Sequence, residues 1–150
     1  MGDGFLPAGY DQAREKTLRV EDCLKALRRS EFTSKFRLNR NDGLYVREKG
    51  LDLIRGHALR FLIARIATAR PKNDGRQTPM RGHPVFVSQH ATATCCRNCI
   101  KKWFGIGKGR ALAASEIDFF VDMIMAWIKD QIQRNTGPGG EQTVRQMSLF

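Results

Sequence analysis

The chain has 150 residues, of which 41% are hydrophobic and 27% charged, and this composition suits one globular domain with its own core. No run approaches the roughly 20 apolar residues that span a bilayer, and the amino terminus lacks the basic and apolar regions of a signal peptide, so a cytoplasmic protein without a membrane partner is expected. The formal net charge of +11 favours an anionic partner, with nucleic acid ahead of a membrane surface or an acidic protein.

Hydrophobic periodicity predicts a mostly α-helical single domain. Residues 1–17 are polar and glycine-bearing, and we expect them to form a loosely ordered lead-in. Apolar residues recur at intervals of three or four in four later segments, which predicts helices at 20–32, 51–67, 91–104 and 115–133. Ser115, with Asp118 three residues later, is typical of a capping box at the start of the last helix.

Turn-forming residues separate the predicted helices. Asn39 to Gly43 predict a turn, because Asn, Asp and Gly tolerate positive φ, and Leu44 to Val46 would follow as a short strand or a link. Residues 70–84 predict a long central loop, and loops of that length are usually functional or disordered. Glycines and a proline after Asn135 end the last helix, so we expect a helical domain at 18–135 and a flexible tail at 136–150.

The end of the tail resembles the peptide with which bacterial proteins bind the DNA sliding clamp. That peptide has the pattern Gln-Leu-Ser/Asp-Leu-Phe, and the chain ends in Gln146-Met147-Ser148-Leu149-Phe150. Methionine replaces leucine with a similar apolar volume, and two apolar anchors on a mobile tether suit a preformed groove. The resemblance implies that the protein works on DNA, with the clamp and DNA as its partners. The alternative is an apolar tail that folds back on its own domain.

Histidine and cysteine are concentrated in residues 82–99. Cys96 and Cys99 have the Cys-x-x-Cys spacing of a zinc knuckle, and His83 and His90 would complete a tetrahedral set. Zinc is therefore the expected cofactor, although iron also accepts such ligands. The alternative interpretation is that the cysteines are small core residues on one face of a helix.

A catalytic interpretation uses the same region. A three-ligand zinc with an open position activates water, and a cysteine thiolate near a helix amino terminus and Arg97 is a nucleophile. A deaminase is excluded because it needs a His-x-Glu pair, and no glutamate lies between Glu48 and Glu116. The candidate catalytic residues are Asp74, Gln77, His83, His90 and Cys96.

A glycine turn with basic neighbours suggests a phosphate contact. Gly105-Ile106-Gly107 resembles the hairpin of helix-hairpin-helix modules, whose backbone N–H groups bind phosphate. The alternative is an ordinary turn between helices. The predicted DNA-binding residues come from the central loop, the third predicted helix and this turn: Arg76, Arg81, Lys101, Lys102, Lys108 and Arg110.

One run of the chain is distinctive, His90-Ala91-Thr92-Ala93-Thr94-Cys95-Cys96-Arg97. Together with Asn73 to Pro79 before it, and with Lys102-Trp103 and Trp127-Ile128 after it, it resembles the prokaryotic domain-of-unknown-function family numbered 4186, over residues 30–132. The resemblance implies no particular activity and places the tail outside the shared domain.

Three functions follow as expectations. The first is a DNA-binding repair or replication accessory factor that the clamp recruits to DNA. The second is a clamp-tethered DNA-processing enzyme, such as a nuclease or a glycosylase. The third is a clamp-binding inhibitor that does not touch DNA.

Overall fold

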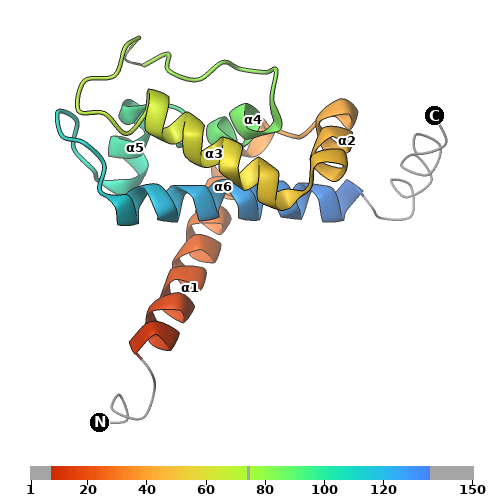
Figure 1. Ribbon diagram of the computed structural model, residues 1–150, viewed down its shortest axis with the longest axis horizontal. Helices are drawn as coiled ribbons and strands as arrows, with labels where there is room; N and C mark the ends of the chain where they lie inside the picture. Colours follow the sequence, from red (N-terminus) through yellow and green to blue (C-terminus); the bar gives the residue numbers. More distant parts are fainter. Residues whose placement is uncertain (1–7, 74, 136–150) are drawn as a thin grey trace.

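Helix α6 (Ala114–Asn135) runs through the centre of the molecule (Figure 1), and it carries the predicted apolar stripe. Phe120, Ile124 and Ile128 are at most 1% exposed, because α1, α3 and α4 pack against α6. Burying each of these side chains contributes about 1.5–3 kcal/mol. The computed structural model describes residues 8–73 and 75–135, which contain six α helices, one 3-10 turn and no strand. The mostly α-helical fold is therefore confirmed.

Helix α1 (Ala8–Arg29) begins earlier than the periodicity indicates. Val20, Leu24 and Leu27 are buried at helical spacing, as predicted. The amino-terminal end of α1 points away from the other helices (Figure 1). Lys16 pairs there with Asp118 of α6. None of the described helices is long and apolar enough to cross a membrane.

Helix α2 (Arg40–Lys49) occupies the segment for which a turn, followed by a short strand or a link, was predicted, and this prediction is wrong. Asn39 is its cap: the side-chain oxygen accepts the Asp42 backbone N–H at 2.8 Å. The same residue types favour helix caps and turns, and the burial of Val46 at 1% exposure favours the helix. Gly50 then turns the chain at φ 86° into α3 (Leu51–Arg65), which confirms the second predicted helix.

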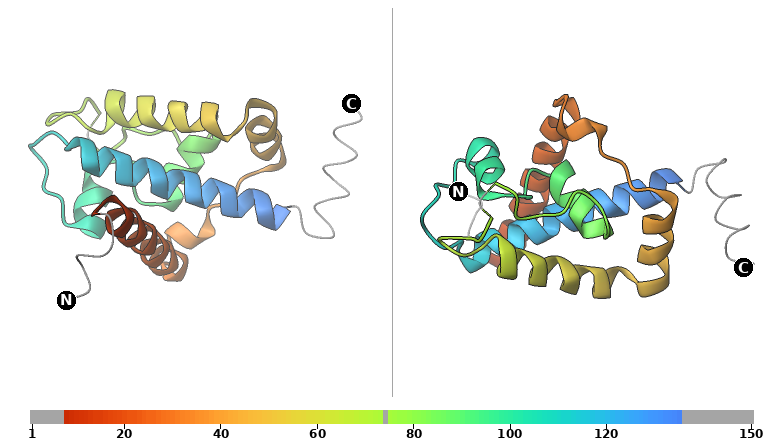
Figure 2. Two further views of the ribbon diagram at one scale, coloured as in Figure 1. Left: turned by 60° about the horizontal axis from the view of Figure 1, so that its bottom comes forward. Right: turned by 90° about the horizontal axis from the view of Figure 1, so that it is seen from above.

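Two short helices replace the single helix predicted at 91–104. Helix α4 (Pro84–Ala91) begins with proline in its first turn, where a missing N–H is tolerated. The chain then leaves the helix through Ala93 at φ 58° and enters α5 (Arg97–Phe104). The predicted central loop is confirmed: it leaves the end of α3, runs back alongside that helix and leads into α4 (Figure 2). A separate 3-10 turn at Thr33–Lys35 lies between α1 and α2.

Glu116, and not Ser115 with Asp118, accepts the hydrogen bond that caps the amino end of α6. The Glu116 carboxylate accepts the Ala113 backbone N–H at 2.7 Å, while Ser115 already lies inside the helix. Asp118 bonds to Arg55 and to α1. The predicted capping box is therefore wrong, although the predicted helix is confirmed.

Candidate metal centre and basic surface

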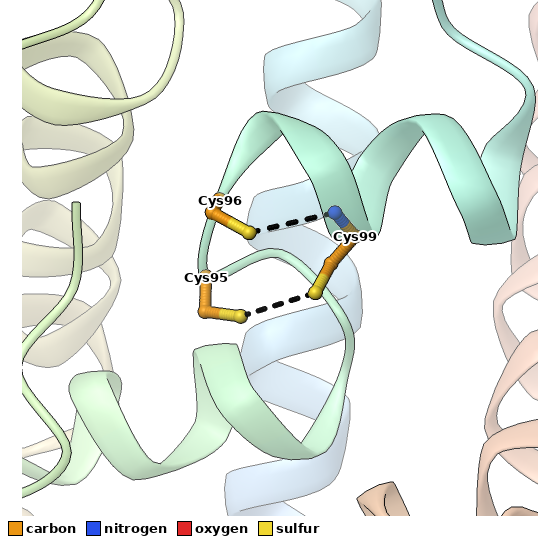
Figure 3. Close-up of side chains that lie close together, drawn as sticks. All are labelled: Cys95, Cys96 and Cys99. Atoms are coloured by element: carbon orange, nitrogen blue, oxygen red, sulfur yellow. Dashed lines mark hydrogen bonds between the residues drawn. The ribbon is translucent and has the colours of Figure 1, made fainter. Parts of the chain in front are cut away.

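Three thiols converge at the amino end of α5. Cys95 and Cys96 precede the helix and Cys99 lies in its first turn, and their sulfur atoms lie within 4.8 Å of one another (Figure 3). The Cys95 Sγ donates to the Cys99 Sγ at 3.6 Å. Cys96 is the cap of α5, and its Sγ accepts the Cys99 backbone N–H at 3.4 Å. No histidine or carboxylate from residues 8–73 and 75–135 joins the group.

Hydrogen bonds lower the pKa of the Cys96 thiol. Those with the neighbouring thiols of Cys95 and Cys99 have the largest effect, and the backbone N–H groups of Cys99 and Asn98 act in the same direction against burial. Hydrogen bonding within the cluster, together with burial, raises the pKa of the Cys95 thiol. A metal ion held by these residues would displace the thiol protons.

The spacing of the sulfur atoms suits a tetrahedral metal ion. Zn–S bonds of about 2.3 Å place two sulfur ligands about 3.8 Å apart in a tetrahedron, close to the 3.6 Å between Cys95 and Cys99. Soft thiolate donors of this kind favour zinc, copper(I) and iron–sulfur chemistry over magnesium or calcium. The cysteine cluster can thus hold a metal ion with three protein ligands.

The two histidines that were expected as metal ligands have other partners. The Nδ1 of His83 accepts the Val85 backbone N–H at 3.0 Å and caps α4, so its proton lies on Nε2, which donates to His57 Nδ1 at 3.0 Å. Burial, with a smaller effect of His57, lowers the pKa of His83 to about 4. His90 donates its Nε2 proton to the Pro79 carbonyl at 3.1 Å. Both rings therefore hold local structure.

Cys95 was not predicted from the sequence as a candidate ligand, because the Cys-x-x-Cys spacing indicates only Cys96 and Cys99. The available signal was the adjacent Cys95-Cys96 pair, directly before a helix. Arg97 also differs from expectation: its guanidinium bonds to backbone carbonyls and not to a thiolate.

The central loop contacts the segment between α4 and α5, which carries Cys95 and Cys96. Thr78 Oγ1 donates to the Cys95 carbonyl at 2.7 Å. Its neighbour Gln77 is 6% exposed; the Gln77 Oε1 accepts the Gly75 backbone N–H at 2.8 Å, while its Nε2 has no partner among the described residues. Of the candidate catalytic residues, Gln77 and Cys96 thus belong to one region, and Asp74 lies outside the described residues.

Four of the predicted DNA-binding residues lie on α5, in the turn after it, and in the part of the central loop next to Asn98. Lys108 Nζ donates to its Oδ1 at 2.7 Å, and a Cβ at Gly75 would lie 3.3 Å from its Nδ2. Lys101 and Lys102 follow Asn98 at the three- and four-residue spacing that places side chains on one helix face. Asn98 and both lysines are exposed. We call this patch the Asn98 basic surface; its members are Arg76, Lys101, Lys102 and Lys108, with Asn98 at the centre.

The remaining two predicted DNA-binding residues have different surroundings. Arg81 is an exposed loop residue. Arg110 donates two hydrogen bonds to Glu116, at 2.9 and 2.7 Å, and this pairing holds the pKa of Glu116 at about 2. The charge of Arg110 is therefore already neutralised by a carboxylate.

The glycine turn also differs from a helix-hairpin-helix module. Gly105 ends α5 in the left-handed conformation, at φ 71°, but α6 begins only at Ala114. Its first backbone N–H groups therefore do not follow the turn directly. This separation favours an ordinary glycine turn between α5 and α6.

A buried arginine fixes these segments. Arg97 is 0% exposed and donates to the carbonyls of Ile66 and Thr68 at 3.3 and 2.9 Å, and to those of Gly107 and Arg110 at 2.9 and 2.8 Å. It therefore ties the end of α3 to the turn after α5.

A family model covers most of this architecture. The family described as Domain of unknown function (DUF4186) matches residues 21–129, more than half of the chain. The chain belongs to this family. In this DUF4186 member the matched residues include α2 to α5 and the cysteine cluster, and they stop before residues 146–150. The clamp-like peptide lies outside both the match and the described residues. No solved structure matches the chain.

Proposed function

We propose that this protein is a zinc-containing, cytoplasmic DNA-binding factor that the sliding clamp brings to DNA for repair or replication. One observation carries the proposal: the cysteine cluster caps the helix whose exposed face bears the Asn98 basic surface. The reducing cytoplasm keeps such thiols available to a metal. A metal at the start of α5 would thus support a cationic face.

The length of α5 explains why a metal would matter. The helix has eight residues, and isolated helices shorter than about 12–15 residues are marginal in water. Zinc held by Cys95, Cys96 and Cys99 would fix its first turn and hence the direction of Lys101 and Lys102. Lysine contacts to phosphate position a protein on DNA without reading the sequence, so the proposed binding is backbone-directed.

The clamp is included in the proposal because of the sequence of residues 146–150. A peptide tethered about ten residues from a domain can reach an effective concentration near the millimolar range, so a weak peptide would suffice to hold the basic domain near DNA. A clamp pull-down with the full chain, and with a chain lacking residues 146–150, tests this step. Equal retention of both forms would remove the clamp from the proposal.

Metal content and DNA binding are tested separately. Purified wild-type protein should contain about one zinc ion per chain by elemental mass spectrometry, and Cys96→Ser should lose it. A metal-free wild-type protein would overturn the zinc assignment.

For DNA, fluorescence anisotropy should show that Lys101→Glu with Lys102→Glu weakens duplex binding at least about 10-fold and lowers the salt slope by about 2. The matched control reverses the charge of two other exposed lysines, with Lys25→Glu in α1 and Lys129→Glu in α6. An equal loss in both variants would show that only net charge matters, against a specific surface.

A second candidate function is a DNA-processing enzyme, which the number of ligands favours. Catalytic zinc sites commonly have three protein ligands and an open position for water, and the cluster offers three. Incubation with duplex, nicked, mismatched and uracil-containing DNA distinguishes the two functions. A product that wild type forms and Cys96→Ser does not would favour the enzyme; no product with zinc, manganese or iron would favour the binder.

A further inference from the structure

The outer face of α3 is unusually apolar for a surface. Leu53, Leu59 and Ile63 are 47%, 42% and 52% exposed, whereas Ile54, Ala58 and Leu62 of the same helix are buried. Helix α3 lies along one edge of the molecule, with the other helices on one side of it (Figure 2, right). No described residue covers these side chains, so the face is free to meet another surface.

A glycine sits in the middle of this face. Gly56 is exposed, and a Cβ built on it would meet nothing within 4 Å. Glycine inside a helix is about 0.8–1.0 kcal/mol less favourable than alanine, and no packing within the described fold requires it. Its distinctive property is that it lets another backbone approach closely.

The face is self-complementary about Gly56. Leu53 and Leu59 lie three residues before and after it, and Asp52 and Arg60 lie four residues before and after it. In an antiparallel pair of α3 helices crossing at Gly56, each Leu53 would therefore lie level with Leu59 of the second copy. Each Asp52 would likewise lie level with Arg60 of the second copy.

The two charges support this arrangement. Asp52 and Arg60 are both exposed, and neither has an ion-pair partner in the part of the chain that the structure describes. In a two-fold symmetric interface every contact occurs twice, with the same patch on both subunits. The antiparallel pairing would thus form two Asp52–Arg60 pairs around a small apolar centre.

We propose that two copies of this chain pair through the outer faces of α3, antiparallel and with Gly56 at the crossing point. The occupant is a second copy because the face matches its own reversed pattern of charge and leucine. A single helix face is smaller than the roughly 800 Å² per partner of a standard interface, so the pairing is concentration-dependent.

Sedimentation equilibrium of the full-length protein over a range of concentrations tests the proposal. Wild type should approach twice the 17.0 kDa monomer mass. Asp52→Arg alone and Arg60→Asp alone should each weaken the dimer at least about 10-fold, because like charges would meet. The variant with both changes should recover to within about 3-fold of wild type, since the pair is restored in reverse.

Gly56→Ala separates pairing from folding. Alanine should raise helix stability and Tm while it weakens the dimer, because its methyl group holds the two backbones apart. Circular dichroism confirms that each variant is folded. A wild-type mass of 17.0 kDa at all concentrations would overturn the proposal. A dimer that is unaffected by the single charge changes and by Gly56→Ala would also overturn it, because a different surface would then form the dimer. Pairing of the α3 face only after DNA or clamp is added would overturn it as well.

Discussion

Replacing Arg97 by methionine should be the most damaging substitution of an arginine in this fold. The side chain is 0% exposed, and its guanidinium donates to four backbone carbonyls in two separate segments. Methionine fills a similar volume but donates nothing. The change therefore isolates the loss of the hydrogen bonds from the loss of packing.

The magnitude follows from the carbonyls left behind. Each fully buried polar group without a partner costs about 1–3 kcal/mol, so four unpaired carbonyls would cost at most about 4–12 kcal/mol. The actual cost is smaller, because only the bond to Ile66 is buried and the bonds to Thr68, Gly107 and Arg110 are part-buried, within reach of water. Removing a buried charge returns several kcal/mol of desolvation. We therefore expect Arg97→Met to lower the free energy of unfolding by about 3–5 kcal/mol. The free energy of unfolding of Arg97→Lys should lie between those of wild type and Arg97→Met, because one ammonium group cannot reach both pairs of carbonyls.

Urea unfolding followed by circular dichroism measures the effect, with Tm as a second readout at about 2–4 °C per kcal/mol. Arg134→Met is the control: Arg134 pairs with Asp130 at 2.8 Å, but its side chain is 64% exposed, so the loss should be below about 0.5 kcal/mol. A loss for Arg97→Met below about 1 kcal/mol, or equal to that of the control, would refute the role assigned to Arg97.

Two further predictions concern pH. Because the folded pKa of His83 is lowered from 6.5 to about 4, the unfolded chain takes up that proton first, and stability present above pH 6.5 is lost as the pH falls towards 4. His83→Asn keeps a capping acceptor for Val85 and should flatten this loss in urea unfolding curves; an unchanged slope would contradict the assignment. The pair of Glu116 with Arg110 contributes stability above the ordinary glutamate pKa of 4.5 that is lost as the pH falls through about 2. Glu116→Gln should therefore lower Tm slightly at neutral pH and converge with wild type in strong acid, and a constant difference would count against the ion pair.

The elements that the sequence predicts well are those with a strict apolar stripe. Helices α3 and α6 were predicted within a few residues, because their buried side chains recur at helical spacing. Helix α2 was not, because Asn39 to Gly43 carry residue types that favour both caps and turns. The choice between the two depends on the burial of Val46, which is a property of the tertiary structure. The break before α5 depends on Ala93 at φ 58°, a conformation that no local signal at an alanine indicates.

The candidate site was predicted only in outline. Sequence spacing identified Cys96 and Cys99, because a Cys-x-x-Cys pair is a local pattern. The choice of third ligand depends on the path of the chain, which brings Cys95 near and uses His83 to cap α4. Arg97 gave no signal, since an arginine beside a cysteine is typical of exposed, reactive thiols and only the fold shows it to be buried.

Cys96 and Arg97 are neighbours in sequence, yet they connect α5 to different structures. Cys96 caps the helix and joins the sulfur cluster, whereas Arg97 bonds to the carbonyls that follow α3 and α5. The two contributions are therefore separable. If zinc acts as proposed, Cys96→Ser should weaken DNA binding by Lys101 and Lys102 while α6 and its core keep most of their stability. Arg97→Met should weaken both together, because it removes the bonds that hold the end of α3 to the turn after α5. A Cys96→Ser protein that binds DNA like wild type would show that the basic surface does not depend on the cysteine cluster, and that the cluster has a separate task.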